Sequence, residues 1–213
     1  MTISSNFPIE FINNAKITDN DSTYIIAKAT NTDDKQCLVK IENGVGVCEA
    51  VTAQTNSASY SYKLSDLPKN TDGNPEFNLT QMHSGRVYVS MKYPLKLYID
   101  SSKPENIAII DPDGFKTRDS NYYTIYDKFE FTFNDKGLWI NPTAVDFLSI
   151  PLQVSLPSSL SDFKNSGLSD KRSDVLASVA KGFSQSESKD EWNKLFSSQI
   201  AYGNGSIIGE NGI

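Results

Sequence analysis

The strongest constraint on the fold is the strict alternation of apolar and polar residues over positions 128–134, which read KFEFTFN. Because side chains alternate between the two faces of a β-strand, this run places Phe129, Phe131 and Phe133 on one face. The sequence NDKG at 134–137 is typical of a tight turn between antiparallel strands. The segment therefore predicts a β-hairpin whose three phenylalanines face a hydrophobic core.

Short apolar runs separated by turn residues extend this pattern over most of the chain. Residues 65–84, rich in Pro, Asn and Asp, are predicted as a long loop. Strands at intervals of roughly 8–12 residues favour one mainly β unit, a sandwich or a barrel, over residues 1–156. The other predicted strands lie at 7–13, 22–30, 36–41, 59–64, within 85–99 with a kink at Tyr93-Pro94, and within 121–156.

The character of the sequence changes after Leu156, where a Ser-rich, linker-like stretch begins. Apolar residues at helical spacing predict a helix over 171–183, with Ser169 or Ser173 as its N-cap. A second short helix is predicted over 189–197. Residues 157–213 are therefore expected to form a smaller helical or α/β portion.

Composition narrows the classes of partner. The net charge is −6 and no basic run or stripe occurs, which argues against nucleic-acid binding. No stretch approaches the roughly 20 apolar residues of a membrane helix. The start, MTISSNFPIEF, lacks the basic and apolar segments of a signal peptide. We therefore expect neither a nucleic-acid nor a membrane partner.

Histidine and cysteine are scarce. His83 is the only histidine, and Cys37 and Cys48 form no Cys-x-x-Cys motif. Zinc sites and histidine-based nucleophilic sites need such residues in combination, so we interpret His83 as a surface or turn residue and expect no cofactor. The cysteines flank the turn-rich sequence IENGVG, where a disulfide across a hairpin and two free thiols both remain possible.

Two carboxylates stand out in this β region. Glu130 and Asp146 are sixteen positions apart, and each lies between two large apolar residues. An acid in such a run is costly to desolvate unless it faces a groove or has a partner. Two such acids in consecutive strands predict a paired-carboxylate site of the kind that hydrolyses glycosidic bonds. The alternatives are a solvent-facing strand for Glu130 and a strand-end acceptor of backbone N–H groups for Asp146.

Other polar and aromatic residues accompany Glu130. Thr132 and Asn134 share its strand face, and Trp139 follows after the turn. Sugars offer apolar faces to aromatic rings and hydroxyl groups to fixed polar side chains. This set is therefore a candidate wall of a sugar-binding groove.

The segment NYYTIYDKFEFTFNDKGLWINPTAVDFLSIPLQVSL, at 121–156, resembles the core signature of the family 64 glycoside hydrolases. Three other stretches agree with the family in order and residue type: FPIEFINN, GRVYVSMKYPLKLYI, and KRSDVLASVAKGF with the following Trp192. The resemblance thus covers most of residues 7–196. It implies a thaumatin-like β-sandwich or barrel domain beside an α/β portion, with 157–213 in the second wall of a groove. Because family members usually continue further, the resemblance leaves three alternatives for this chain: a fragment, a truncated relative, or a version in which the second groove wall is reduced.

The resemblance also implies roles for individual residues. The family consists of endo-β-1,3-glucanases that invert the anomeric carbon. Its general acid falls on Glu130 and its general base on Asp146, while sugar-binding positions fall on Thr132, Asn134 and Trp139. The implied function is endo-hydrolysis of β-1,3-glucan, outside the cell, by a monomer. The alternative is a non-catalytic β-glucan-binding or interaction protein on the same scaffold, which would have no need of the acid pair.

Overall fold

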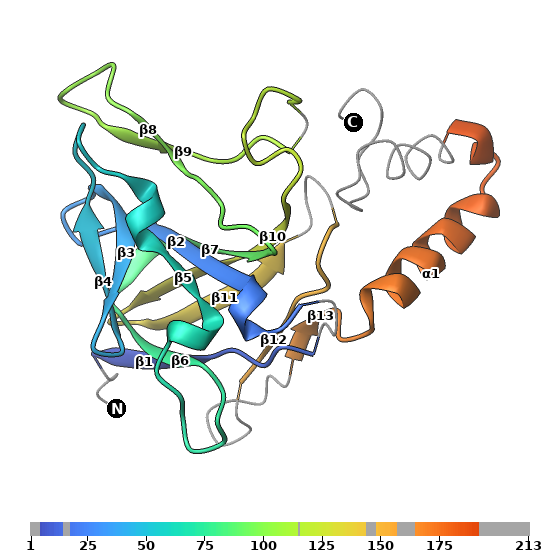
Figure 1. The fold of residues 1–213 in the computed structure, drawn as a ribbon, viewed down its shortest axis with the longest axis horizontal. Coiled ribbons are helices and arrows are strands. Elements are labelled where there is room, and N and C mark those ends of the chain that lie inside the picture. Colours follow the sequence, from blue (N-terminus) through green and yellow to red (C-terminus); the bar gives the residue numbers. More distant parts are fainter. Residues whose placement is uncertain (1–4, 15–17, 115, 144–147, 157–164, 192–213) are drawn as a thin grey trace.

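The computed structural model describes residues 5–14, 18–114, 116–143, 148–156 and 165–191 (Figure 1). Within these residues, nine strands form one sheet, which confirms the prediction of a mainly β fold. The strands of this sheet are β1 (Asn6–Glu10), β2 (Thr23–Thr30), β3 (Gln36–Glu42), β4 (Val45–Ala50), β5 (Ser61–Lys63), β6 (Glu76–Thr80), β7 (Met82–Met91), β10 (Ile125–Asn134) and β11 (Gly137–Thr143).

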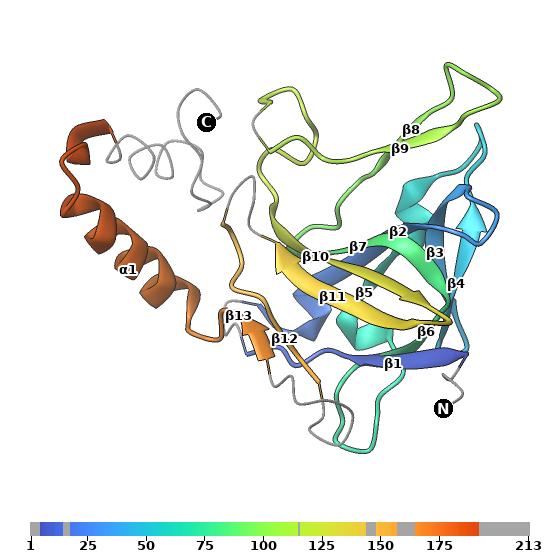
Figure 2. The same ribbon diagram turned by 180° about the vertical axis from the view of Figure 1, so that it is seen from behind.

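The smaller elements surround this sheet. Figures 1 and 2 show the helix α1 (Arg172–Ser184) beside the sheet rather than within it. Among the described residues, no helix is long and apolar enough to cross a bilayer. The other elements are β8 (Tyr98–Asp100) with β9 (Ala108–Ile110), β12 (Gln153–Ser155) with β13 (Asn165–Gly167), and the 3₁₀ helices η1 (Asn20–Ser22), η2 (Ser57–Tyr60) and η3 (Leu64–Asp66).

The sheet is curled, so that strands near its two ends face one another. Its order is β1-β6-β4-β3-β2-β7-β10-β11, with β5 paired to β2. The pairings are antiparallel except for β4 with β6. The ring centroids of Phe7 on β1 and Phe133 on β10 are 5.9 Å apart, although five strands lie between these two in the sheet. The curl therefore encloses a core.

That enclosed core contains the phenylalanine face predicted from the sequence. Phe129, Phe131 and Phe133 are at most 7% exposed and pack with residues of β2, β3, β6 and β7. Gly85 on β7 lies opposite Phe131 on β10, beneath the aromatic ring. Burial of these rings removes a large apolar area from water, which stabilises the hairpin against the rest of the sheet.

A second apolar cluster covers part of the outer face of the sheet. The side chains of Tyr88 and Tyr126 project from the sheet on this side. They pack with Leu95, Leu97 and Ile109. The long segment between β7 and β10, which includes β8 and β9, thus lies over the outer face of the central strands.

The cysteines adopt one of the two states left open by the sequence. A disulfide joins Cys37 on β3 to Cys48 on β4, with the Cα atoms 5.4 Å apart. Cys37 is fully buried, and the bond links two neighbouring strands of the sheet.

Several predicted boundaries are wrong. The predicted loop at 65–84 contains β6 and the start of β7, because Phe77 and Leu79 pack into the inner core. Residues 148–152 are not a strand, and β12 begins only at Gln153. The N-cap of α1 is Lys171 and makes no side-chain cap bond.

The remaining expectations on organisation stay predictions. Most of the second helix predicted over 189–197 lies outside the described residues. The division of the chain at residue 156 and the thaumatin-like character of its β unit also stay predictions.

Candidate active site

Glu130 lies on the outer face of the sheet, opposite in direction to the buried phenylalanines. It occupies β10 between Arg86 on β7 and Asn141 on β11. Its side chain is 36% exposed, so the carboxylate is within reach of solvent and of a ligand. Strand parity explains this placement, because the neighbours Phe129 and Phe131 both turn inward.

A groove of about 500 Å³ opens over Glu130. Thr132 and Trp139 lie directly opposite one another on β10 and β11, and both line it. Trp139 is 53% exposed, as expected for an indole that stacks on sugar. The Thr132 hydroxyl accepts a 3.3 Å hydrogen bond from the Ser84 backbone N–H. The full lining is Lys28, Ala29, Thr30, Gln36, Ser84, Gly85, Arg86, Glu130, Phe131, Thr132, Trp139 and Asn141.

Asn134 is separate from this group. It is the last residue of β10, and its side-chain oxygen accepts a 2.8 Å hydrogen bond from the Lys136 N–H in the hairpin turn. Among the described residues, the groove lining does not include Asn134. The structure thus brings Glu130, Thr132 and Trp139 together and places Asn134 at the end of the hairpin.

Asp146 lies outside the described residues, which stop at Thr143 and resume at Leu148. The resuming segment is fixed to β10 by Asp127, which is 3% exposed. One oxygen of Asp127 accepts the Ser149 and Ile150 N–H groups at 3.0 and 3.1 Å. Burial raises the pKa of Asp127 to about 6, although hydrogen bonds from backbone N–H groups oppose the rise.

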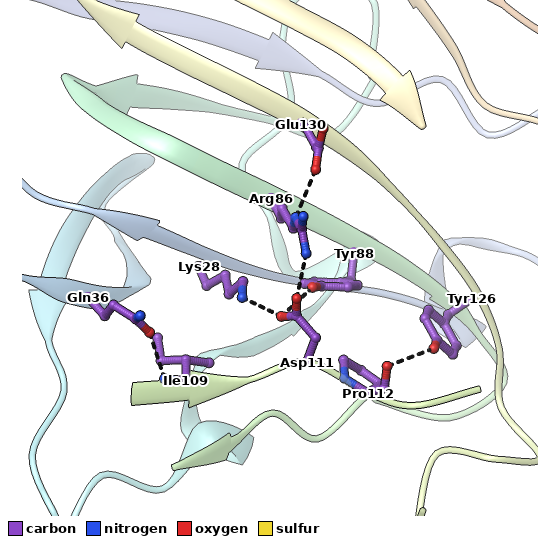
Figure 3. Close-up of polar contacts among 9 residues, drawn as sticks. All are labelled: Lys28, Gln36, Arg86, Tyr88, Ile109, Asp111, Pro112, Tyr126 and Glu130. Carbon is purple, nitrogen blue, oxygen red and sulfur yellow. Dashed lines mark hydrogen bonds and ion pairs between the residues drawn. The ribbon is translucent and has the colours of Figure 1, made fainter. Parts of the chain in front are cut away.

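A charged network lies beside the groove (Figure 3). Arg86 donates from Nε to Glu130 Oε1 at 2.9 Å and from a terminal nitrogen to Asp111 Oδ2 at 2.5 Å. The other oxygen of Asp111 accepts a 2.7 Å bond from the Tyr88 hydroxyl and an ion pair from Lys28. Arg86 therefore bridges two carboxylates, only one of which lines the groove.

The ionisation of these groups follows from their contacts. Burial opposes the ionisation of Asp111, but hydrogen bonds from Lys28 and Tyr88 and the nearby positive charges outweigh it and lower its pKa. Burial, reinforced by the charge of Asp111, raises the pKa of the Tyr88 hydroxyl. Burial acts against the charge of Arg86, yet the groups around it raise its pKa overall. At neutral pH the network thus holds an ionised Asp111 and a cationic Arg86.

Sequence reasoning missed Arg86, Asp111, Lys28 and Tyr88. Arg86 and Tyr88 had a detectable signal, because they alternate with Gly85, Val87 and Val89 and so share the outer face of β7. Asp111 had none, since it follows β9 in an irregular segment and reaches the site only through tertiary contacts.

Sequence comparison identifies curated relatives over part of the chain. A curated relative, the glucan endo-1,3-beta-glucosidase of Cellulosimicrobium cellulans, is 36% identical over 75 residues, which are 34% of this chain and 13% of the relative. The enzyme of the same name from Arthrobacter sp. (strain YCWD3) matches equally. The chain thus aligns with only a small part of the curated relatives.

Solved structures show the same fold. One is a laminaripentaose-producing beta-1,3-glucanase of family 64 from Paenibacillus barengoltzii, complexed with laminarihexaose, with a TM-score of 0.73 and 22% identity. The alignment covers 96% of this chain and 48% of that one. A family 64 beta-1,3-glucanase domain from Clostridium beijerinckii gives a TM-score of 0.69 at 19% identity, over 85% of this chain and 50% of that one.

The sequence profile of the family described as Beta-1,3-glucanase matches residues 5–208, which is nearly the whole chain. The profile, the curated relatives and the shared fold agree on one assignment. This chain belongs to glycoside hydrolase family 64, the β-1,3-glucanases.

Proposed function

We propose that this chain binds β-1,3-glucan in the groove over β10 and β11 and hydrolyses it internally, with inversion at the anomeric carbon. The observation that carries the proposal is the placement of Glu130 in a groove beside an exposed indole and a fixed hydroxyl. Membership of the family and the activity named for its relatives support the same substrate.

The chemistry needs two carboxyl groups with different duties. Glu130 donates a proton to the glycosidic oxygen as the bond to the anomeric carbon breaks. Asp146 takes a proton from a water molecule that attacks the same carbon from the opposite face. For this route the two carboxyl groups stand roughly 6.5–9.5 Å apart, which leaves room for the water. Trp139 and Thr132 hold the sugar against the acid.

The test is release of reducing sugar from a linear β-1,3-glucan. We expect activity in the wild type and a loss of at least about 100-fold in both Glu130→Gln and Asp146→Asn. Glu76→Gln on β6, outside the groove lining, is the matched control and should retain activity. Equal rates in the wild type and in Glu130→Gln would contradict the proposal.

One observation favours the alternative of a non-catalytic glucan-binding protein. The Glu130 carboxyl accepts a 2.9 Å hydrogen bond from the cationic Arg86, whereas a proton donor must present a protonated carboxyl to the glycosidic oxygen. Binding of glucan by the wild type, unchanged in Glu130→Gln and without release of sugar, would support this alternative.

We further propose that the protein acts outside the cell as a monomer, because an insoluble or high-molecular-weight glucan does not enter cells. Activity in the culture medium and a sedimentation mass equal to one chain would support this placement. Retention of all activity in the cell lysate would contradict it.

A further inference from the structure

We propose that Arg86 and Asp111 are positioning residues that set how strong an acid Glu130 is. Arg86 binds the carboxylate form of Glu130, and Asp111 offsets part of the positive charge of Arg86. This inference rests on the proposed role of Glu130 as proton donor.

The geometry fixes Arg86 between the two acids. Its Nε and one terminal nitrogen each donate to a different carboxylate, at 2.9 Å to Glu130 and at 2.5 Å to Asp111 (Figure 3). A planar guanidinium that makes two such bonds keeps its orientation better than a single-point ammonium would. The Nε–H therefore stays directed at the carboxyl of Glu130.

Asp111 is itself held from several sides. Tyr88 and Lys28 both contact its second oxygen. The chain on either side is fastened to the sheet, because the Ile109 N–H donates to Gln36 at 2.6 Å and the Tyr126 hydroxyl donates to the Pro112 carbonyl at 3.4 Å. Asp111 is outside the groove lining and so acts on the substrate through Arg86 and Lys28, which both line the groove and contact Asp111.

The charges of the network explain why Arg86 would lie beside a proton donor such as Glu130. Lys28, Arg86, Asp111 and an ionised Glu130 sum to zero, whereas the same group with Glu130 protonated carries one positive charge. The network is thus balanced after the proton has moved to the glycosidic oxygen and the leaving sugar has taken it as a hydroxyl. Arg86 favours the transfer by stabilising the carboxylate that forms, and Asp111 keeps this effect small enough for Glu130 to be protonated beforehand.

The described charged groups near Glu130 come from several elements. Arg86 and Tyr88 belong to β7, Lys28 to β2, and Lys128 precedes Glu130 by two residues on the same face of β10. On the other side, β11 presents Asn141 and Trp139, neither of which titrates in the relevant pH range. Asp111, which follows β9, adds a negative charge through Arg86.

The proposal predicts shifts of opposite sign in two variants. Removing the cation with Arg86→Gln should move the alkaline limb of the kcat/KM profile upward by about one pH unit. Removing the negative charge with Asp111→Asn should move this limb downward, while the asparagine oxygen can still accept from Arg86. Two substitutions that only damaged the structure would lower kcat/KM without moving the limb in opposite directions.

The matched control is Glu42→Gln, which removes a carboxylate from the exposed ion pair with Lys40. It should leave the limb in place. The double variant Arg86→Gln/Asp111→Asn should lie between the single ones. If Asp111→Asn does not fold, Lys28→Gln takes its place. It should move the limb upward by less than Arg86→Gln does, and a limb that stays at its wild-type position in both variants overturns the inference.

A second measurement does not depend on activity. In protein labelled with carbon-13 at the glutamate carboxyls, the signal absent from Glu130→Gln identifies this residue. Its titration midpoint should rise in Arg86→Gln and fall in Asp111→Asn. The inference is overturned if the Glu130 midpoints of Arg86→Gln and Asp111→Asn move in the same direction, or if neither moves more than the midpoint of Glu42→Gln. Neither result would contradict the proposed hydrolysis of glucan. Hydrolysis that survives Glu130→Gln overturns the proposed function instead, whatever the midpoints do.

Discussion

Gly85 is a position where one added methyl group should strongly destabilise the fold. It lies on β7 opposite Phe131, and both residues also border the groove. A Cβ built on Gly85 would stand 2.7 Å from Cε2 of the Phe131 ring and closer still to Cζ and Cε1. Because real Cβ atoms essentially never approach other atoms so closely, Gly85→Ala forces the ring to move.

The magnitude follows from where the ring can go. Phe131 is 3% exposed and packed on the inner side of the sheet, so it has little free space. Overpacking of a filled core costs about 1–3 kcal/mol, and complete loss of a buried phenylalanine side chain costs about 3–5 kcal/mol. We therefore expect Gly85→Ala to lower the free energy of unfolding by about 3 kcal/mol, and Tm by roughly 6–12 °C.

Urea denaturation followed by circular dichroism measures this loss. Gly182→Ala is the control, because a Cβ at Gly182 in α1 meets nothing within 4 Å; its free energy of unfolding should stay unchanged or rise by up to about 1 kcal/mol. Phe131→Leu should cost less in the Gly85→Ala background than in the wild type, with a coupling of at least about 1 kcal/mol. A loss below about 0.5 kcal/mol in Gly85→Ala would refute the reasoning.

Three further predictions concern the buried acid, the disulfide and the indole. The pKa of Asp127 is raised to about 6 from 3.8, so the folded state binds its proton more tightly than the unfolded state. The free energy of unfolding of the wild type should therefore fall by about 2 kcal/mol relative to Asp127→Asn between pH 4 and pH 7, and a flat or rising difference would contradict this sign. Reduction of the bond between Cys37 and Cys48, which are 11 positions apart, should lower the free energy of unfolding by roughly 2–3 kcal/mol. An unchanged urea midpoint after reduction would contradict this prediction. Trp139→Ala should raise KM for linear β-1,3-glucan about tenfold at unchanged stability, whereas Tyr123→Ala, at a still more exposed ring outside the groove lining, should not.

The hairpin of β10 and β11 was predictable because its information is local. A period of two over 128–134 determines which side chains face inward, and the turn that follows fixes the partner strand. The same parity placed Glu130 and Thr132 on one face, where the groove is found. The groove wall was predicted to extend as far as Asn134, but this residue lies at the turn.

Features that depend on distant parts of the chain were not predictable. β6 is short and surrounded by turn-forming residues, and it becomes a strand through its pairing with β1 and β4. The α1 cap was misplaced because the backbone carbonyl of Lys171 accepts from Asp174 and Val175, while the Ser173 hydroxyl contacts the Asp174 side chain instead. The contact of Arg86 with Asp111 joins residues 25 positions apart and follows no sequence period.

The most direct test of the central claim is the anomeric form of the first product. Proton magnetic resonance, recorded within the first minutes of cleavage of a linear β-1,3-glucan oligosaccharide, distinguishes newly formed α ends from β ends before they interconvert. Direct displacement by water, with Glu130 as the acid, predicts that the α anomer appears first. Initial appearance of the β anomer, or no cleavage at all, would contradict the account.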